Sequence, residues 1–281
     1  MKKLIAVVLS LVLTLSLASA LADTITIAVP NDATNEGRAL LLLQSAGVLT
    51  LKEGAGLEAT KADIETTTVD IEIYEVVADN APNVLADVDY AIINNNYALD
   101  AGLNPVADSL LIEDANSPYV NVVSVKEGNE DSDAAKALAA ALTSQTVVDY
   151  INNTYGGSAI ATVAEPTDGF DATVDYDALK GTTISVAATP IPHEQVLKIA
   201  AEILAEKEIS LDIIVVTDYT TPNEFVESGD VFANYFAHQP YQDNFNAQTN
   251  GHLMTIAGIH VEPMALYGGQ QSDLSALGIA K

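Results

Sequence analysis

A functional site in this sequence could be formed by its histidines, by the asparagines of its asparagine-rich segments and by its single arginine. Cysteine is absent, which excludes thiol nucleophiles and cysteine-based metal sites. His193 and Glu194 begin like a zinc-binding H-E-x-x-H motif, but Leu197 stands where the second histidine is needed. Neither a Walker A phosphate loop nor a G-x-S-x-G nucleophile motif occurs. We therefore predict no metal, no cofactor and no enzymatic activity.

Arg38, the only arginine, lies in the segment 30–38, which joins a predicted strand to a predicted helix. Open α/β sheets bind ligands in the loops at the carboxyl ends of their strands. A guanidinium recognises a carboxylate through two parallel hydrogen bonds, so Arg38 is a candidate for binding a ligand carboxylate. The alternative is an ordinary ion pair with Glu36 or another nearby acid. The composition alone does not favour either role of Arg38 over the other.

Two asparagines are candidates for contacts to a ligand head group. Asn94 follows the apolar residues of a predicted strand, and Asn121 lies inside another strand, where a polar side chain needs a buried partner. Amides can accept from an ammonium group and donate to a carboxylate. The alternative roles are helix capping and turn formation for Asn94 and a hydrogen bond to backbone for Asn121.

Aromatic side chains gather in one part of the sequence and would suit a thioether or an aliphatic chain. The alternative is that they form part of the hydrophobic core. The candidates are Tyr219, Phe236, His238 and Tyr241.

Composition narrows the class of protein. The 281 residues include 39 acidic and 11 basic ones, for a formal net charge of −28, and 49% are hydrophobic. That apolar fraction is enough for a folded core. The sequence shows no Lys/Arg patch that would bind nucleic acid or an anionic membrane surface.

Residues 1–22 have the pattern of a secretory signal peptide. Lys2 and Lys3 precede an apolar run over 4–17, and small residues follow at 18–22. The run is shorter than a membrane-spanning helix requires. We expect an exported protein, periplasmic or extracellular, with no membrane span after cleavage.

Short apolar strands alternate with helical patterns along the rest of the chain, which predicts an α/β protein with open, mostly parallel sheets and helices on both faces. The residues 164–181 are polar and rich in turn formers, and we interpret them as a linker. A last extended segment is predicted over 253–267.

Several motifs together resemble the methionine-binding (NlpA/MetQ) family of substrate-binding proteins of ABC transporters. The resemblance implies a two-lobed, type II periplasmic-binding-protein-like fold, each lobe a mixed, mostly parallel sheet flanked by helices, with the ligand cleft between the lobes. It also implies a monomer that captures L-methionine and delivers it to an ABC importer permease. The motifs are VPNDATNEGRALLLL (29–43), INNNYA (93–98), SPYVN (117–121), ATPIPH (188–193), DYTTPN (218–223), ANYFAHQPY (233–241) and HVEPMALY (260–267).

These motifs stand in a different order from that of the family, in which the segments resembling 182–281 precede those resembling 23–163. The sequence therefore resembles a circular permutant in which the linker joins the family's old ends. We predict one lobe over 23–116 and the other over 117–281. The new chain ends would interrupt one connection between the lobes, leaving a single crossing near 114–119.

By motif match, Arg38 resembles the residue that pairs with the methionine carboxylate, and Asn94 and Asn121 resemble the head-group amides. The four aromatic candidates resemble the residues around the methionine side chain. Asn95 and Ile191 depart from the family pattern, and the cysteine that carries a lipid in family members is absent. The alternatives are another amino acid or a short dipeptide as ligand and, ranked last, an enzyme on the same scaffold.

Overall fold

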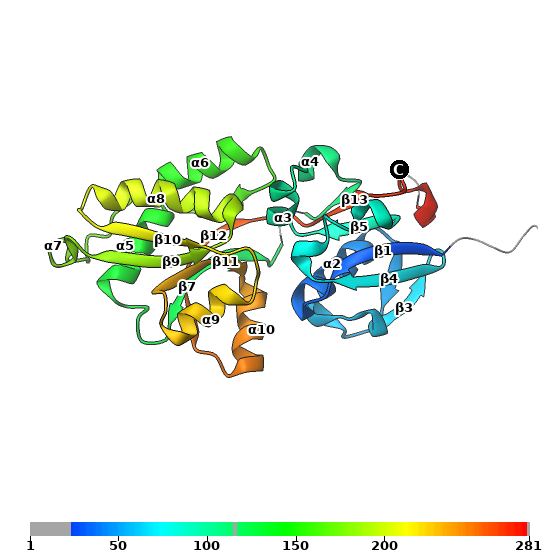
Figure 1. The fold of residues 1–281 in the computed structure, drawn as a ribbon, viewed down its shortest axis with the longest axis horizontal. Coiled ribbons are helices and arrows are strands. Elements are labelled where there is room, and N and C mark those ends of the chain that lie inside the picture. Colours follow the sequence, from blue (N-terminus) through cyan, green and yellow to red (C-terminus); the bar gives the residue numbers. More distant parts are fainter. Residues whose placement is uncertain (1–23, 115–116, 280–281) are drawn as a thin grey trace, which may run out of the picture.

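The computed structural model describes residues 24–114 and 117–279, so the predicted signal peptide at 1–22 lies outside the described residues. Two lobes lie side by side, each built on its own sheet (Figure 1). Within these ranges, no helix has both the length and the apolar character that a membrane span requires.

The first lobe contains a five-stranded sheet in the order β4-β1-β5-β13-β6 and a small two-stranded sheet, β2-β3. Side chains that alternate along β1 enter opposite apolar clusters: Ile27 packs with helix α2, and Ala28 packs on the α3 side. The elements of this lobe are β1 (Ile25–Pro30), α2 (Ala33–Ser45), β2 (Leu49–Leu51), β3 (Ile64–Thr67), β4 (Ile71–Val76), β5 (Tyr90–Ile93), α3 (Asn95–Asp100), α4 (Pro105–Asp108), β6 (Leu111–Ile112) and β13 (Ala265–Gly268).

The second lobe contains a six-stranded sheet in the order β10-β9-β11-β7-β12-β8. Helices α5, α6 and α8 pack on it around one continuous apolar cluster. The elements of this lobe are β7 (Val120–Lys126), α5 (Asp133–Leu142), α6 (Gln145–Tyr155), β8 (Ile160–Ala161), α7 (Tyr176–Leu179), β9 (Thr183–Ala188), α8 (Gln195–Ala205), β10 (Ser210–Val215), α9 (Thr221–Ser228), β11 (Ala233–His238), α10 (Gln239–Thr249) and β12 (Leu253–Val261).

The sheets are mixed, but parallel pairing is confined to one side of each. In the first sheet β1 runs parallel to β4 and β5, whereas β13 is antiparallel to β5 and β6. In the second sheet β9 runs parallel to β10 and β11, whereas β7, β12 and β8 pair antiparallel. The expectation of mostly parallel sheets is therefore wrong, because strands next to the lobe crossings enter each sheet in the opposite direction.

The predicted boundary that assigned 117–281 to one lobe is also wrong. The extended segment expected over 253–267 breaks at Pro263, which has no N–H for a ladder hydrogen bond. Val261 still pairs with Val120 in the second sheet, whereas Ala265 pairs with Ile93 in the first. The chain therefore crosses between lobes twice, once between Glu113 and Val120 and once around Pro263.

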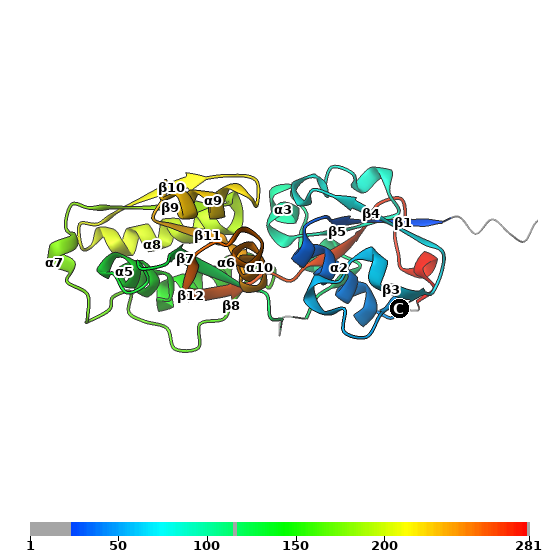
Figure 2. The same cartoon turned by 90° about the horizontal axis from the view of Figure 1, so that it is seen from below.

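The ends of the described chain both lie in the first lobe, at its side remote from the second (Figures 1 and 2). The amide of Ile25 donates to Asp70 O at 2.9 Å, and the hydroxyl of Thr68 donates to Leu277 O at 2.6 Å. The expectation that the ends interrupt a lobe connection is therefore wrong. The predicted linker 164–181 lies in the second lobe between β8 and β9, and it includes the short helix α7.

The assignment of β13 to the first lobe predicts the effect of a core substitution. Leu266 in β13 is fully buried, and Leu266→Ala should lower the free energy of unfolding by about 2–5 kcal/mol through the cavity it leaves. Hydrogen exchange should show the loss of amide protection in β1 and β5. The matched control is Leu197→Ala, equally buried in the second lobe, which should loosen β9 and β11 instead. Loss of protection in the second lobe on Leu266→Ala would contradict the assignment.

Candidate functional site

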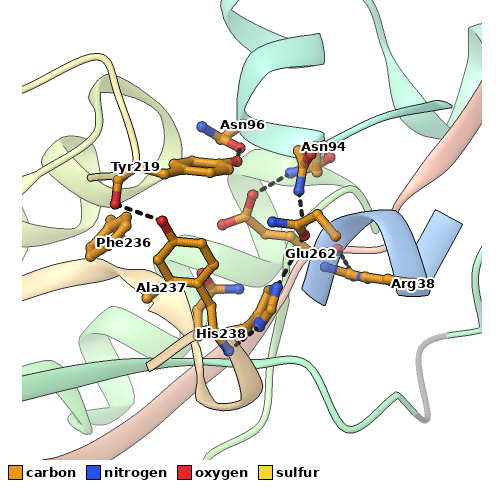
Figure 3. Close-up of a pocket in the computed structure, with 12 residues that line it drawn as sticks. Arg38, Asn94, Asn96, Tyr219, Phe236, Ala237, His238 and Glu262 are labelled. Carbon is orange, nitrogen blue, oxygen red and sulfur yellow. Dashed lines mark hydrogen bonds between the residues drawn. The ribbon is translucent and has the colours of Figure 1, made fainter. Parts of the chain in front are cut away.

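A cavity lies between the lobes, and all seven predicted site residues line it (Figure 3). The residues around it are Asn35, Arg38, Asn94, Asn95, Asn96, Asn121, Tyr219, Phe236, Ala237, His238, Tyr241 and Glu262.

Both lobes contribute through the ends of their central elements. In the first lobe, helix α2 carries Asn35 and Arg38, and Asp32 caps its first turn by accepting from the amide of Asn35. The three consecutive asparagines 94–96 follow β5 at the start of α3. In the second lobe, Asn121 lies on β7, Phe236 and His238 on β11 and Tyr241 on α10, whereas Tyr219 lies between β10 and α9. Glu262 lies in the crossing after β12.

Arg38 is buried, and both its Nε and its Nη2 donate to one carboxylate, that of Glu113. Its Nε lies 3.1 Å from Glu113 Oε1, and its Nη2 lies 2.5 Å from Oε2 and 2.7 Å from Glu262 O. The Tyr119 ring lies 4.2 Å from the guanidinium carbon. The alternative expectation is an ion pair with Glu36 or another nearby acid. Arg38 does form an ion pair, but with Glu113, whereas Glu36 accepts from the amide of Lys61. The hydrogen bonds of Arg38 to described residues are made by Nε and Nη2.

A chain of hydrogen bonds fixes the orientation of the amides. Tyr241 N donates to His238 Nδ1, so the proton of His238 is on Nε2 and is donated to Asn35 Oδ1 at 3.1 Å. Asn94 Nδ2 donates to the same oxygen at 2.9 Å. The carbonyl oxygen of Asn94 consequently remains without a partner within the described residues.

Asn121 has the buried partner that its position in a strand requires. His193 Nε2 lies 3.0 Å from Asn121 Oδ1, while Nδ1 of the same ring lies 2.7 Å from the hydroxyl of Thr189. The amide nitrogen of Asn121 is then directed elsewhere and can donate to a ligand.

The aromatic candidates form one wall of the cavity. The ring centroid of Tyr219 lies 6.0 Å from that of Phe236 and 5.9 Å from that of Tyr241. The hydroxyl of Tyr219 donates to Asn96 Oδ1, and that of Tyr241 donates to Tyr219 O. Burial raises the pKa of both phenols, so both are neutral and present an apolar surface.

Glu262 is buried between two histidines. Its Oε1 lies 2.8 Å from His260 Nε2 and 3.1 Å from His193 Nε2, and its Oε2 accepts from Asn95 Nδ2 at 3.0 Å. Burial opposes ionisation, but His193, His260 and Asn95 together hold the pKa of Glu262 below its ordinary value. The carboxylate is therefore ionised and faces the cavity.

His193, His260 and Glu262 have the donor types of a metal site, and their ligand atoms lie within 4.8 Å of one another. His193 is not part of an H-E-x-x-H motif, but two residues distant in the sequence, His260 and Glu262, bring potential ligand atoms close to it. Each ring nitrogen already has a protein partner, since Nδ1 of His260 lies 2.6 Å from the Tyr235 hydroxyl. The hydrogen bonds of the described residues satisfy this cluster without a cation.

The sequence analysis missed four polar residues of the cavity: Asn35, Asn95, Asn96 and Glu262. The asparagines are neighbours of Arg38 and Asn94 in the same loops, so the loop pattern itself could have identified them. Glu262 lies within the HVEPMALY motif, but nothing local distinguishes it from the many solvated acids of the chain.

Two buried neutral histidines predict a loss of stability in acid. Burial lowers the pKa of His193 to about 3 and also lowers that of His238 well below its ordinary value. Between about pH 6.5 and 3 the unfolded chain therefore binds protons that the folded chain does not, so the free energy of unfolding falls as the pH falls. Each ring adds a slope of up to about 1.4 kcal/mol per pH unit.

The check is urea denaturation at several pH values in this window for His193→Gln, which should show the shallower slope. The reference is the wild type, whose slope over the same window includes the contributions of both buried rings. An unchanged slope for His193→Gln would show that the ring is not held neutral.

Comparisons with known proteins identify relatives of parts of this chain. The probable D-methionine-binding lipoprotein MetQ of Pasteurella multocida is 43% identical over 129 residues, which are 46% of this chain and 47% of that protein. The D-methionine-binding lipoprotein MetQ of Yersinia pestis is 41% identical over 136 residues, 48% of this chain and 50% of that protein. The chain thus spans about half the length of these curated relatives.

Among solved structures, a nutrient binding protein from Burkholderia cenocepacia bound to methionine matches 51% of this chain and 62% of its own, with 43% identity and a TM-score of 0.48. The family model described as NlpA lipoprotein matches residues 14–163 and 184–280, which is far more than half of the sequence. This chain therefore belongs to the NlpA lipoprotein family.

Proposed function

We propose that this protein is an extracytoplasmic substrate-binding protein that captures methionine between its lobes and delivers it to an ABC importer. The observation that carries the proposal is the polarity of the cavity. Hydrogen-bond donors of Arg38 and Asn121 line it together with an aromatic wall, so a carboxylate and an apolar side chain can be bound at once.

Arg38 would bind the ligand carboxylate, while one edge of its guanidinium is fixed by Glu113. Such a fixed guanidinium loses little conformational entropy when the ligand arrives. The amide nitrogen of Asn121 supplies a second donor. Tyr219, Phe236 and Tyr241, with His238 at the edge, would surround the thioether, because aromatic rings make favourable contacts with sulfur.

The names of the relatives support methionine as the ligand, although they give it as D-methionine. The resemblance described above implies L-methionine, and we retain the L form in the proposal, so both enantiomers belong in the assay. A different amino acid or a short dipeptide is the alternative ligand.

Contacts between the lobes indicate how binding would be signalled. His238 to Asn35, Tyr219 to Asn96, and the hydroxyl of Tyr97 to Thr217 O at 2.9 Å all join residues of different lobes. Closure of two lobes around a ligand is a common hinge movement, and the importer permease would recognise the closed monomer. The sequence has no cysteine to carry a thioether-linked lipid, so the proposal includes export without that anchor.

The site assignment predicts the loss of methionine binding on removal of Arg38. Arg38→Ala alone would leave the Glu113 carboxylate buried without its partner, so we choose the double variant Arg38→Met, Glu113→Gln. Its affinity for methionine in calorimetry should fall by about 100-fold or more. Glu113→Gln alone is the matched control, because it keeps the guanidinium and should retain measurable binding. Wild-type affinity in the double variant would refute the role of Arg38.

We also propose that the chain is a circular permutant of its family. The two blocks of the family match are separated by the residues 164–183, and each curated relative aligns with about half of this chain and half of itself. A linear comparison of a rearranged order gives such halves. The position of both chain ends against the segment 68–70 further supports the proposal, because permutation requires neighbouring ends.

Permutation predicts that the reverse rearrangement is tolerated. A chain in which residue 279 is joined by a short flexible linker to residue 24, and which is opened within 164–181, should fold with the wild-type unfolding midpoint and methionine affinity. The control is the same joined chain opened between Leu197 and Lys198, inside the packed helix α8, which should not fold. Failure of the chain opened within 164–181 would contradict the proposal.

A further inference from the structure

Tyr97 joins the two lobes but is not among the residues that line the ligand cavity. It lies on α3, on the side of the first lobe that meets the second (Figures 1 and 2), and it is only 7% exposed. Its hydroxyl donates to the backbone oxygen of Thr217 at 2.9 Å, in the loop between β10 and α9 of the second lobe. This cross-lobe hydrogen bond therefore forms beside the ligand cavity rather than inside it.

The ring of Tyr97 supports one wall of the ligand cavity from behind. Its centroid lies 4.8 Å from that of Tyr219, with 34° between the ring planes. Tyr219 belongs to the second lobe, yet it packs against an apolar cluster whose other members, such as Ile93 and Tyr267, belong to the first. Its hydroxyl donates to Asn96 Oδ1, also in the first lobe (Figure 3). The first lobe thus holds Tyr219 in place, and the aromatic wall is complete only while the lobes are together.

A second, outer cavity lies on the other side of this wall. Tyr219 and Tyr241 line both cavities, so their rings lie between the two, whereas Tyr97 lines the outer cavity and not the inner one. Because both lobes contribute to its lining, the outer cavity widens when the lobes move apart. The residues around it are Asn31, Asp32, Val77, Ala78, Asp79, Tyr97, Asp218, Tyr219, Thr220 and Tyr241.

The contact made by Tyr97 differs from the other polar contacts that join the lobes. Those of His238 and Tyr219 are made by residues that line the ligand cavity, so a bound ligand changes their surroundings. Asn244 Nδ2 donates to Glu58 Oε1 at 2.8 Å, but this pair is exposed, and water can take over such a bond at little cost. The Tyr97 hydroxyl is joined to a side chain that is almost fully buried, so opening the lobes must break this bond and uncover the ring.

We propose that Tyr97 is a positioning residue that latches the closed lobes and sets the rate at which methionine leaves. Release requires the lobes to open, which breaks the Tyr97–Thr217 hydrogen bond and separates the rings of Tyr97 and Tyr219. The encounter of methionine with the open form needs neither contact, so the latch acts on dissociation rather than on association. The inference rests on the proposed function and adds the residue that controls the lifetime of the complex.

Two substitutions of Tyr97 grade the effect. Tyr97→Phe keeps the ring stacking but removes the hydrogen bond, and the dissociation rate of methionine should rise by about 3- to 10-fold. Tyr97→Leu removes both contacts, and the rate should rise by about 10- to 100-fold. The association rate should not fall in either variant. The rates are measured on the full chain by displacing isotopically labelled methionine with an excess of unlabelled methionine.

Tyr90→Phe is the matched control. The hydroxyl of Tyr90 donates to Asp273 O at 2.6 Å, so this variant also removes a hydrogen bond from a tyrosine to a backbone oxygen, but within the first lobe. It should lower stability in urea as Tyr97→Phe does and leave the dissociation rate of methionine at the wild-type value. Equal acceleration in both variants would overturn the latch, because it would show a general loosening of the first lobe.

A measurement without ligand tests the latch independently. The chain has no cysteine, so Asp87→Cys in the first lobe and Glu224→Cys in the second give a single pair of sites for nitroxide spin labels. Both positions are exposed. Pulsed electron paramagnetic resonance should show two distances between the labels, and Tyr97→Phe should raise the ratio of the open to the closed form by about 3- to 10-fold. An unchanged ratio would contradict the latch.

The outcomes separate the latch from the proposed function. If calorimetry shows that the wild type does not bind methionine, the proposed function fails, and the label distances alone decide whether Tyr97 latches the lobes. If the wild type binds methionine and Tyr97→Phe releases it at the wild-type rate, methionine capture stands and the latch is refuted. If Tyr97→Leu does not fold, Tyr97→Phe, which removes a single oxygen atom, decides alone.

Discussion

The guanidinium of Arg38 is the interaction on which the geometry between the lobes depends. It extends from helix α2 to Glu113, the last residue before one lobe crossing, and to the backbone oxygen of Glu262 in the other crossing. The Tyr119 ring, which follows the first crossing, stacks against it. One cation thus joins both connections, and a neutral side chain would leave Glu113 buried and unpaired at that point. Any ligand bound by Arg38 therefore contacts a residue that already touches both connections between the lobes.

In the rest of the cavity, chains of hydrogen bonds determine which groups donate and which accept. The hydrogen-bond chain that begins at the backbone amide of Tyr241 passes through His238 and Asn35 and fixes Asn94. A second chain runs from the hydroxyl of Tyr235 through His260 to Glu262, and a third runs from the hydroxyl of Thr189 through His193 to Asn121. Because each step leaves only one orientation for the next group, the free site already presents donors and acceptors in fixed places. Such preorganisation is what lets a small zwitterion bind tightly with few contacts.

Local pattern predicted the parts of this site that lie at strand ends. Arg38, Asn94 and Asn121 could be selected from the sequence because polar residues after or within buried strands need partners. The Arg38–Glu113 pair could not, since its members are separated by 75 positions and Glu113 has no local signal. Pro263 was the available sign that the extended segment over 253–267 changes sheets, and a proline inside a strand pattern argues against a continuous strand. The pairing of β13 with β5, by contrast, depends on tertiary packing, which the hydrophobic periodicity of the sequence does not predict.

The strong acidity of the chain affects which ligands can approach this site. A net charge of −28 creates a negative field that repels anions over roughly a Debye length, about 8–10 Å at moderate salt. A zwitterion carries no net charge and is not repelled, whereas an acidic amino acid or an N-acylated one is. Within the cavity, the positive charge of Arg38 is already balanced by the Glu113 carboxylate. The long-range field therefore favours a ligand without net charge over one with an extra carboxylate.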